Sequence, residues 1–386
     1  MEFSLSPHRR IRLTLGFDDV SLVPSATTVD PRDVDVSFQL GPHSFKFPII
    51  ASAMDGVVSP SFAILLHELG GLGVVNLEGI FTRYEKPQSV LQQIVAASDE
   101  ESTALLQQIY REPVKPKLIE DVIRQMKDAG ALAAGSLTPR ATRDMGKVAV
   151  DAGLDILVVQ STVTSPRYRT TRGHALSISE LTENLEIPLL VGNCVSYEVA
   201  LEFMHAGIDG VLVGVGPGQA CTTRAVTGVG VPQVTATAEV AAARDDFHEN
   251  TGKYVSVITD GGMRQGGQIA KALAAGADAV MLGSIFAGCP ETPAAPYHWG
   301  MATPDPSLPR GTRVRVDKQI PARQLLFGPT SATDGTENLV GCIVSSMSLC
   351  GAARIREMHE IELVFSLSFL SEGKNLQRGQ RLGMGV

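Results

Sequence analysis

Short apolar runs recur along the chain and are separated by glycine or polar residues. Runs of this kind, rich in Val, Ile and Leu, are typical of buried strands. They occupy residues 48–51, 72–75, 132–134, 156–159, 188–191, 210–213, 255–258 and 279–282. Stretches with helical periodicity, such as residues 197–206 and 268–275, lie between them. The alternation predicts repeated strand–helix units and therefore a parallel sheet.

The number of predicted strands distinguishes two α/β architectures. Eight strand–helix units favour a closed (β/α)8 barrel, the TIM barrel, as a single domain over residues 1–386. The alternative is an open, doubly wound sheet with fewer strands. No Gly-x-Gly-x-x-Gly motif follows the first predicted strand and opens a helix, which counts against the open sheet.

Two stretches exceed a minimal barrel. Residues 80–127 carry helical patterns only, and we expect them to form a short helical insertion after the second strand. Residues 289–329 are rich in proline and charge and show no sustained period. Long loops in compact domains are usually functional, so we expect residues 289–329 to form a mobile active-site loop after the eighth strand.

Composition narrows the class of protein. The chain has 386 residues, of which 44% are hydrophobic, enough for one large core. No apolar run reaches the roughly 18 residues that a membrane-spanning helix needs, and no signal-peptide pattern opens the sequence. A net charge of −8 without a dense basic block argues against nucleic acid and membrane surfaces as partners. The five scattered cysteines predict free thiols in a reducing cytoplasm and no zinc site.

Glycine-rich turns follow the last two predicted strands. Asp260-Gly261-Gly262 comes after the seventh strand and Gly283-Ser284 after the eighth. In (β/α)8 barrels these two loops often hold a phosphate group, which glycine amides and the Ser284 hydroxyl can approach closely. The Asp260 carboxylate suits a ribose diol, because it accepts two hydroxyl hydrogens. The alternative interpretation is a pair of tight turns with a solvated aspartate.

A specialised loop follows the sixth predicted strand. Its sequence, GVGPGQACTTR over residues 214–224, places three glycines at alternate positions and excludes a regular helix. It carries Cys221 to the same end of the barrel, among threonines and an arginine that favour a thiolate nucleophile. An inert, buried Cys221 is the alternative, and Cys194 at the end of the fifth predicted strand is the second candidate nucleophile. No histidine pattern near Cys221 predicts a Cys–His dyad.

The cysteine loop resembles that of the IMP dehydrogenase/GMP reductase family. Further matching segments are residues 17–24, 52–55, 191–193, 228–233, 260–263 and 269–288. The resemblance extends over most of residues 13–300 and weakens in the insertion and beyond residue 301. Typical dehydrogenases of this family carry a tandem regulatory domain at the insertion point, and here a short helical segment replaces it.

The resemblance implies a role for each matching residue. Cys221 would attack C2 of the purine, and Thr223 would help to move protons. Residues that would contact the purine nucleotide are Ser52, Met54, Asn193, Asp260, Gly262, Gly283, Ser284, Gly300 and Met301. The cofactor NAD would lie against Gln160, Ser161 and Thr162. Backbone carbonyls of Gly216, Gly218 and Cys221 resemble a potassium site.

Five positions depart from the family pattern. Gln219 stands where the family has a phosphate-binding serine, and Gln160 where it has an aspartate for the nicotinamide ribose. Residues 298–299 are His-Trp instead of tyrosine and a basic residue. Arg310 aligns with a glutamate, and residues 292–336 contain no glutamate.

The resemblance implies oxidation of IMP to XMP, in which hydride passes to NAD and water hydrolyses the cysteine adduct. Arg313 and Arg315 are the catalytic candidates on the mobile loop. We prefer Arg313 because we expect it to lie nearer the loop tip. Arg310 lies on the same loop. The alternatives are a GMP reductase using NADPH and a non-catalytic purine-nucleotide-binding regulator; the cysteine loop disfavours a flavin-dependent barrel. The family also implies a homo-oligomer, either a tetramer or an octamer.

Overall fold

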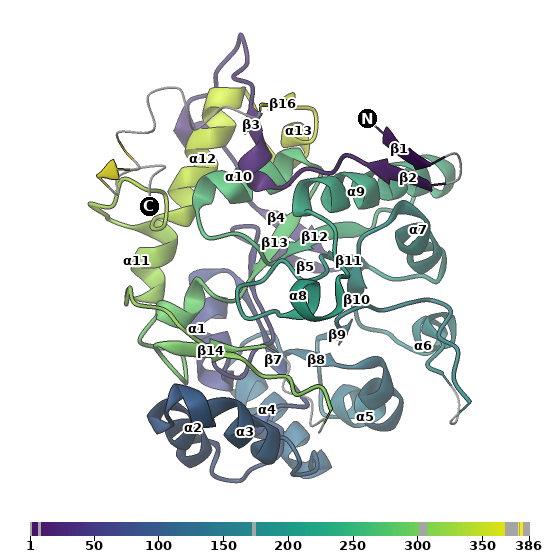
Figure 1. The fold of residues 1–386 in the computed structure, drawn as a ribbon, viewed down its shortest axis with the longest axis vertical. Coiled ribbons are helices and arrows are strands. Elements are labelled where there is room, and N and C mark those ends of the chain that lie inside the picture. Colours follow the sequence, from purple (N-terminus) through teal and green to yellow (C-terminus); the bar gives the residue numbers. More distant parts are fainter. Residues whose placement is uncertain are drawn as a thin grey trace.

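The computed structural model describes residues 2–6, 9–171, 175–300, 307–366, 377 and 379–380. Eight parallel strands close into a barrel in the order β10-β11-β12-β13-β6-β7-β8-β9 (Figure 1). The strands are β6 (Ile49–Ala51), β7 (Leu72–Asn76), β8 (Ala134–Leu137), β9 (Ile156–Gln160), β10 (Leu189–Cys194), β11 (Gly210–Val213), β12 (Ser256–Asp260) and β13 (Ala279–Leu282). The (β/α)8 barrel is thereby confirmed, and the open sheet is excluded because β13 pairs with β6.

Helices surround the barrel in the order of the chain. They are α1 (Pro60–Leu69), α4 (Pro116–Asp128), α5 (Pro139–Asp151), α6 (Ile178–Glu183), α7 (Tyr197–His205), α9 (Gln233–Thr251) and α10 (Gly266–Ala274). Local signals define α1, since the Ser59 side chain accepts the Phe62 amide at its start and Gly70 ends it in the left-handed conformation. Among the described residues, no helix is both long and apolar enough to cross a membrane.

The predicted insertion divides into two parts. The 3-10 turn η3 (Ile80–Thr82) and the helices α2 (Pro87–Ala96) and α3 (Asp99–Ile109) are additions to the barrel. By contrast, α4 packs between α1 and α5 and is the helix that the second strand–helix unit requires. We call α2 and α3 the α2–α3 insertion; they lie together in Figure 1, in dark blue.

A hairpin fills the barrel at the N-terminal ends of its strands. It consists of β4 (Phe38–Leu40) and β5 (His43–Phe45), and its buried Phe38, Leu40 and Phe45 share one apolar cluster with the side chains inside the barrel. The Ser256 hydroxyl, at the first residue of β12, donates to the Gln39 carbonyl at 3.3 Å. The hairpin therefore leaves the C-terminal ends of the strands as the place for a pocket.

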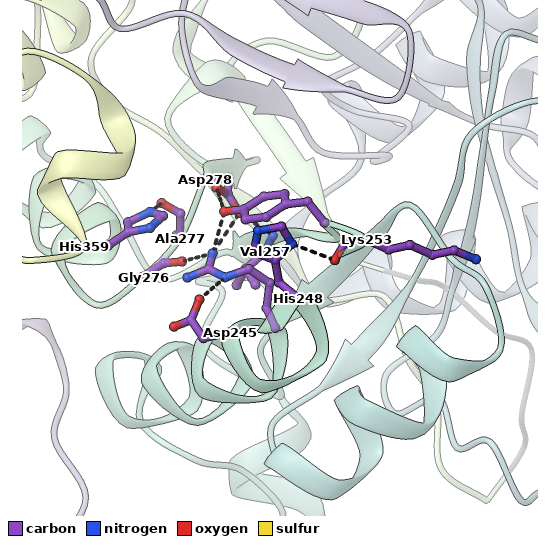
Figure 2. A network of polar contacts seen from close by, with 10 residues as sticks. Asp245, His248, Lys253, Val257, Gly276, Ala277, Asp278 and His359 are labelled. Atoms are coloured by element: carbon purple, nitrogen blue, oxygen red, sulfur yellow. Dashed lines mark hydrogen bonds and ion pairs between the residues drawn. The ribbon is translucent and has the colours of Figure 1, made fainter. Parts of the chain in front are cut away.

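A buried polar network fixes α9 to the N-terminal ends of β12 and β13 (Figure 2). The Arg244 guanidinium donates to the Asp278 carboxylate at 3.2 Å, to the Tyr254 hydroxyl at 2.9 Å and to the Gly276 carbonyl at 3.0 Å. Asp278 also accepts the Tyr254 hydroxyl at 2.5 Å and the Val257 amide at 2.8 Å. Arg244 and Asp278 are almost fully buried, and each carries several partners, as buried charges must.

The chain after β13 contains regular structure that the sequence did not predict. It forms η4 (Phe286–Gly288), the antiparallel pair β14 (Tyr297–Trp299) and β15 (Arg313–Arg315), and α11 (Ala322–Phe327). Residues 289–329, expected to form a mobile active-site loop, thus contain β14, β15 and α11, and their mobility stays a prediction. Strands of three residues and a helix of six are too short to produce a recognisable period.

The remaining elements lie outside the barrel strands, and one of them, α8, carries the pocket residue Thr223. They are β1 (Glu2–Ser6), β2 (Arg9–Arg12), η1 (Phe17–Asp19), β3 (Val20–Leu22), η2 (Pro31–Asp33), α8 (Thr223–Thr227), α12 (Leu339–Cys350), α13 (Ile355–Met358) and β16 (Leu363–Phe365). The late strand β16 pairs with the early strand β3, and α12 packs against α10 and α11. Segments from the two ends of the described chain are therefore joined on one side of the barrel.

Candidate functional site

A pocket lies at the C-terminal ends of the barrel strands, where (β/α)8 proteins carry their sites. Fifteen of the residues predicted from the sequence line it: Ser52, Met54, Gln160, Ser161, Thr162, Asn193, Gly216, Gly218, Cys221, Thr223, Asp260, Gly262, Gly283, Ser284 and Gly300. Met301 lies outside the described residues. Loops that are far apart in the sequence thus meet in one cavity, because the closed sheet brings all strand ends to one rim.

The acid of the pocket is Asp260, the last residue of β12. Its Oδ2 atom accepts the side-chain amides of Asn193 at 2.8 Å and Gln160 at 2.9 Å. Gln160 also donates to the Asn193 side-chain oxygen at 3.0 Å, so the three side chains hold one another in place. Burial raises the pKa of Asp260 to about 6, against the two amides, which lower it. Both amides use Oδ2, which leaves Oδ1 as the acceptor for a ligand.

Gln160 therefore does more than the sequence predicted. The resemblance places it against the cofactor, and the structure places it in the pocket as a partner of Asp260. A carboxylate at position 160 would lie beside Asp260 and raise its pKa further, because two like charges oppose each other's ionisation. The amide instead donates a hydrogen bond to Asp260.

The thiol of the pocket belongs to Cys221. It is the exposed member of the five cysteines, and its Sγ lies 3.2 Å from the Thr223 hydroxyl. Cys194, the second candidate nucleophile, is buried, and burial raises its pKa to about 12. Burial also raises the pKa of Cys289. Since the thiolate is the nucleophilic form, the structure favours Cys221 over the buried cysteines.

Arg224 closes the base of the cysteine loop. Its guanidinium donates to the backbone carbonyls of Val215 at 3.0 Å and Val231 at 2.6 Å. Gly216 has a φ of 74°, and a Cβ there would lie 2.6 Å from the Arg224 side chain. Glycine at position 216 thus allows the loop to fold over Arg224, which explains one of the three alternating glycines.

The two glycine loops pack tightly against other parts of the pocket. Gly261 and Gly262 have φ values of 80° and 85°, which favour glycine. A Cβ on Gly283 would lie 2.4 Å from the Met54 sulfur, so the loop after β13 fits closely against the loop after β6. The buried Gln233, which the sequence analysis did not single out, donates to the Asp260 carbonyl at 2.9 Å and holds the loop after β12.

The arginines after β14 occupy different places. Arg310 lines the pocket and donates to the Thr162 hydroxyl at 2.9 Å. Arg313 does not line the pocket; its side chain is 2% exposed and is held by the α2–α3 insertion. Arg315 is 65% exposed and lies 3.6 Å from Asp317. Arg313 pairs with Trp299 at the end of β15 nearer the connecting loop, as expected, but its side chain contacts the insertion.

A buried polar cluster adjoins the pocket. The Tyr110 hydroxyl, just after α3, donates to Asp55 and accepts the Trp299 indole N–H at 2.9 Å. Asn76 donates to the same carboxylate at 3.3 Å. Burial raises the pKa of Asp55 to about 6. The cluster fixes the residues next to Met54 and next to Gly300. Its sequence signals were Asp55 in the matching segment 52–55 and the departure from the family pattern at residues 298–299.

The His-Trp pair at residues 298–299 lies beneath the pocket rather than in it. His298 is fully buried, and burial lowers its pKa to about 4. Its imidazole is therefore neutral near pH 7, so this departure from the family pattern brings no charge to the pocket.

Comparisons with known proteins identify the family. A family model described as the IMP dehydrogenase / GMP reductase domain matches residues 14–301. An uncharacterized oxidoreductase of Mycobacterium bovis is 37% identical over 364 residues, which cover 92% of this chain and 97% of the relative. The inosine-5'-monophosphate dehydrogenase of Cryptosporidium parvum is 34% identical over 292 residues, covering 72% of this chain and 69% of that enzyme.

A solved structure extends the similarity to the whole fold. An IMP dehydrogenase/GMP reductase-like protein from Corynebacterium glutamicum superposes with a TM-score of 0.89 and 31% sequence identity. The match covers 95% of this chain and 98% of that chain. With its barrel, its cysteine loop and the matched residues, the chain belongs to the IMP dehydrogenase/GMP reductase family of oxidoreductases.

Proposed function

We propose that this oxidoreductase oxidises IMP to XMP with NAD through a covalent adduct on Cys221. The observation that carries the proposal is the exposed Cys221–Thr223 pair in the same pocket as the Asp260 carboxylate and the two glycine loops. These are the groups that a purine nucleotide requires: a nucleophile for the base, an acceptor for the ribose and amides for the phosphate.

The reaction begins with the nucleotide held at both ends. Asp260 accepts the ribose hydroxyls, and Ser284 with the backbone amides of Gly262 and Gly283 holds the phosphate. The Cys221 thiolate then attacks C2 of the purine and forms a carbon–sulfur bond. A bound NAD supplies the acceptor for the hydride that leaves C2. The Thr223 hydroxyl, in contact with the sulfur, relays the thiol proton: it accepts that proton as it releases its own hydrogen to solvent, and the reverse transfer reprotonates the thiol.

The second half of the reaction releases the product. Water attacks C2 of the thioimidate, the carbon–oxygen bond forms and the carbon–sulfur bond breaks, so Cys221 recovers its proton and XMP leaves. Arg310 is our candidate for orienting this water, because it is the arginine of its loop that lines the pocket. Since a guanidinium stays protonated, Arg310 donates hydrogen bonds to the water rather than removing its proton.

The pocket residues next to Arg310 offer groups that suit a dinucleotide cofactor. Gln160, Ser161, Thr162 and Arg310 offer amide, hydroxyl and guanidinium groups to ribose and phosphate oxygens. We also propose, on the family resemblance alone, that the backbone carbonyls of Gly216, Gly218 and Cys221 bind a potassium ion. The described residues contain no cluster of histidine, cysteine and carboxylate side chains for another metal.

GMP reductase is the second candidate, and the anchoring of Arg313 favours it. Hydrolysis in the dehydrogenase reaction is expected to need a loop that moves into the place of the departed cofactor. Here Arg313 is buried against the α2–α3 insertion, which restrains the loop before β15. Reduction of GMP to IMP releases ammonia and requires no such exchange, because the nucleotide and the nicotinamide react side by side.

One pair of assays decides between these proposals. The purified protein is incubated with IMP and NAD, and separately with GMP and NADPH, while the nicotinamide absorbance is followed. Each assay is run in potassium and in sodium chloride. NADH formation with IMP supports the dehydrogenase, and NADPH loss with GMP supports the reductase. Tight binding of either nucleotide without turnover of either pair would leave the non-catalytic regulator.

A further inference from the structure

The α2–α3 insertion and the loop before β15 form one connected unit. We propose that Arg313 is a positioning residue that fixes residues 307–312 and thereby keeps Arg310 in the pocket. The proposal rests on the proposed function only in taking this pocket as the active site. It assigns to the insertion a task in the site itself, although α2 and α3 do not line the pocket.

The insertion provides a socket for a cation where α2 ends and α3 begins. The Arg313 guanidinium donates to the carbonyls of Ile94 at 2.6 Å and Ala97 at 2.9 Å. The last carbonyls of a helix lack partners within the helix and carry the negative end of its dipole. The second guanidinium nitrogen reaches the Asp99 carboxylate at 2.7 Å, at the first residue of α3. One side chain thus satisfies the end of one helix and contacts the start of the next.

The pairing of β14 with β15 aims Arg313 at this socket. Trp299 lies opposite Arg313, and Tyr297 lies opposite Arg315. The Arg313 guanidinium stacks on the Tyr297 ring, with its central carbon 4.2 Å from the ring centroid. A buried guanidinium is costly unless it is paired, and here a ring, a carboxylate and backbone carbonyls surround it. These contacts determine the position of β15 on the insertion.

Arg310 is held from both sides. The Gln107 side chain of α3 donates to its backbone carbonyl, and its own guanidinium donates to the Thr162 hydroxyl at 2.9 Å. Arg310 and Arg313 are three residues apart, so an extended chain between them spans at most about 11 Å. Anchoring Arg313 therefore confines Arg310 to the pocket wall. The anchor of Arg313 adds to the hydrogen bonds that Gln107 and Thr162 make with Arg310.

The test compares Arg313→Gln and Arg313→Lys with Arg315→Gln in the full chain. Arg315 neighbours Arg313 in β15, but it does not line the pocket, and its exposed side chain lies 3.6 Å from Asp317, which makes it a matched control. Hydrogen exchange of residues 307–312, the affinity for the nucleotide, and KM and kcat for the active substrate pair are measured. We expect Arg313→Gln to accelerate exchange about tenfold and to raise KM for the dinucleotide by a similar factor.

Nucleotide affinity should stay within about twofold in Arg313→Gln, because Asp260 and the glycine loops are untouched. Arg313→Lys should show a smaller effect of the same kind, and it keeps the test decisive if Arg313→Gln does not fold. Unchanged exchange in a folded Arg313 variant, or equal effects in Arg315→Gln, would overturn the proposal. If no substrate pair is turned over, the exchange measurement still decides, so failure of the proposed function is distinguishable.

Discussion

At the scale of single residues, Cys221 and Asp260 are the proposed nucleophile and the proposed ribose-binding acid, and their surroundings differ. Cys221 is exposed beside a threonine, whereas Asp260 is enclosed by two amides. The first group is placed to react and the second to bind. Substitutions at the two positions should therefore affect different measurements.

Cys221→Ala should abolish turnover while leaving nucleotide affinity within about threefold of the native value, because the thiol takes part only in the covalent step. Calorimetric titration with the nucleotide and a steady-state assay measure the two effects. Cys194→Ala, at a buried position, is the control and should retain turnover. Turnover above a few per cent in Cys221→Ala would refute the assignment of the nucleophile.

Nucleotide affinity should fall as the pH drops below about 6. The pKa of Asp260 is raised to about 6, and the ionised carboxylate is the form that accepts two ribose hydroxyls. Below that pH the ionised fraction falls about tenfold per unit, and affinity should follow it. Asp260→Asn provides the reference, because the nucleotide phosphate titrates in the same range. A native pH profile identical to that of Asp260→Asn would contradict the role of Asp260.

Sequence patterns predicted the residues that line the pocket better than the residues that hydrogen-bond to them. Asp260, Cys221 and the glycine turns follow strands directly, so the barrel fold alone brings them together. Gln233 and Tyr110 could not be predicted in this way, because their hydrogen bonds depend on contacts between elements that are distant in the sequence. Arg313 was assigned to the pocket by its loop, and only the pairing of β14 with β15 shows where it lies.

At the scale of elements, the eight barrel strands were predictable because each is a buried apolar run. The third predicted run, residues 132–134, meets β8 only at its last residue, since the strand continues through the small residues of Ala134–Leu137. The helix α4 was assigned to the insertion because the sequence does not show which helix packs on the barrel. The short elements after β13 were not predicted, because they have too few residues to show a hydrophobic period in the sequence.

The network at the N-terminal ends of β12 and β13 should matter for stability and not for catalysis. Arg244→Met leaves the buried Asp278 without its cation and should lower the free energy of unfolding by about 3 kcal/mol. Urea denaturation measures this loss, and kcat should stay unchanged. Arg356→Met is the control: this exposed arginine only stacks on the Tyr254 ring, and its loss should cost under about 1 kcal/mol. Equal losses in the two variants would contradict the importance of the buried pair.

At the scale of the whole molecule, the homo-oligomer implied by the family stays a prediction. Exposed apolar side chains occur at Leu349, Val364 and Phe365, on α12 and β16, and these elements are our candidates for subunit contacts. Light scattering at micromolar concentration measures the mass of the assembly. A tetramer should weigh four times the 41.0 kDa of one chain. A mass of one chain would reject the prediction.

The pairing of β13 with β6 also affects when the protein acquires its ligand during synthesis. The ribosome releases β6 early, yet β6 remains an open edge until β13, the last barrel strand, has emerged. Gly283 and Ser284, which follow β13, complete the phosphate side of the pocket at the same moment. On the proposed function, bound nucleotide would contact the loops after β13 and β6 at this seam and would favour the closed ring by mass action.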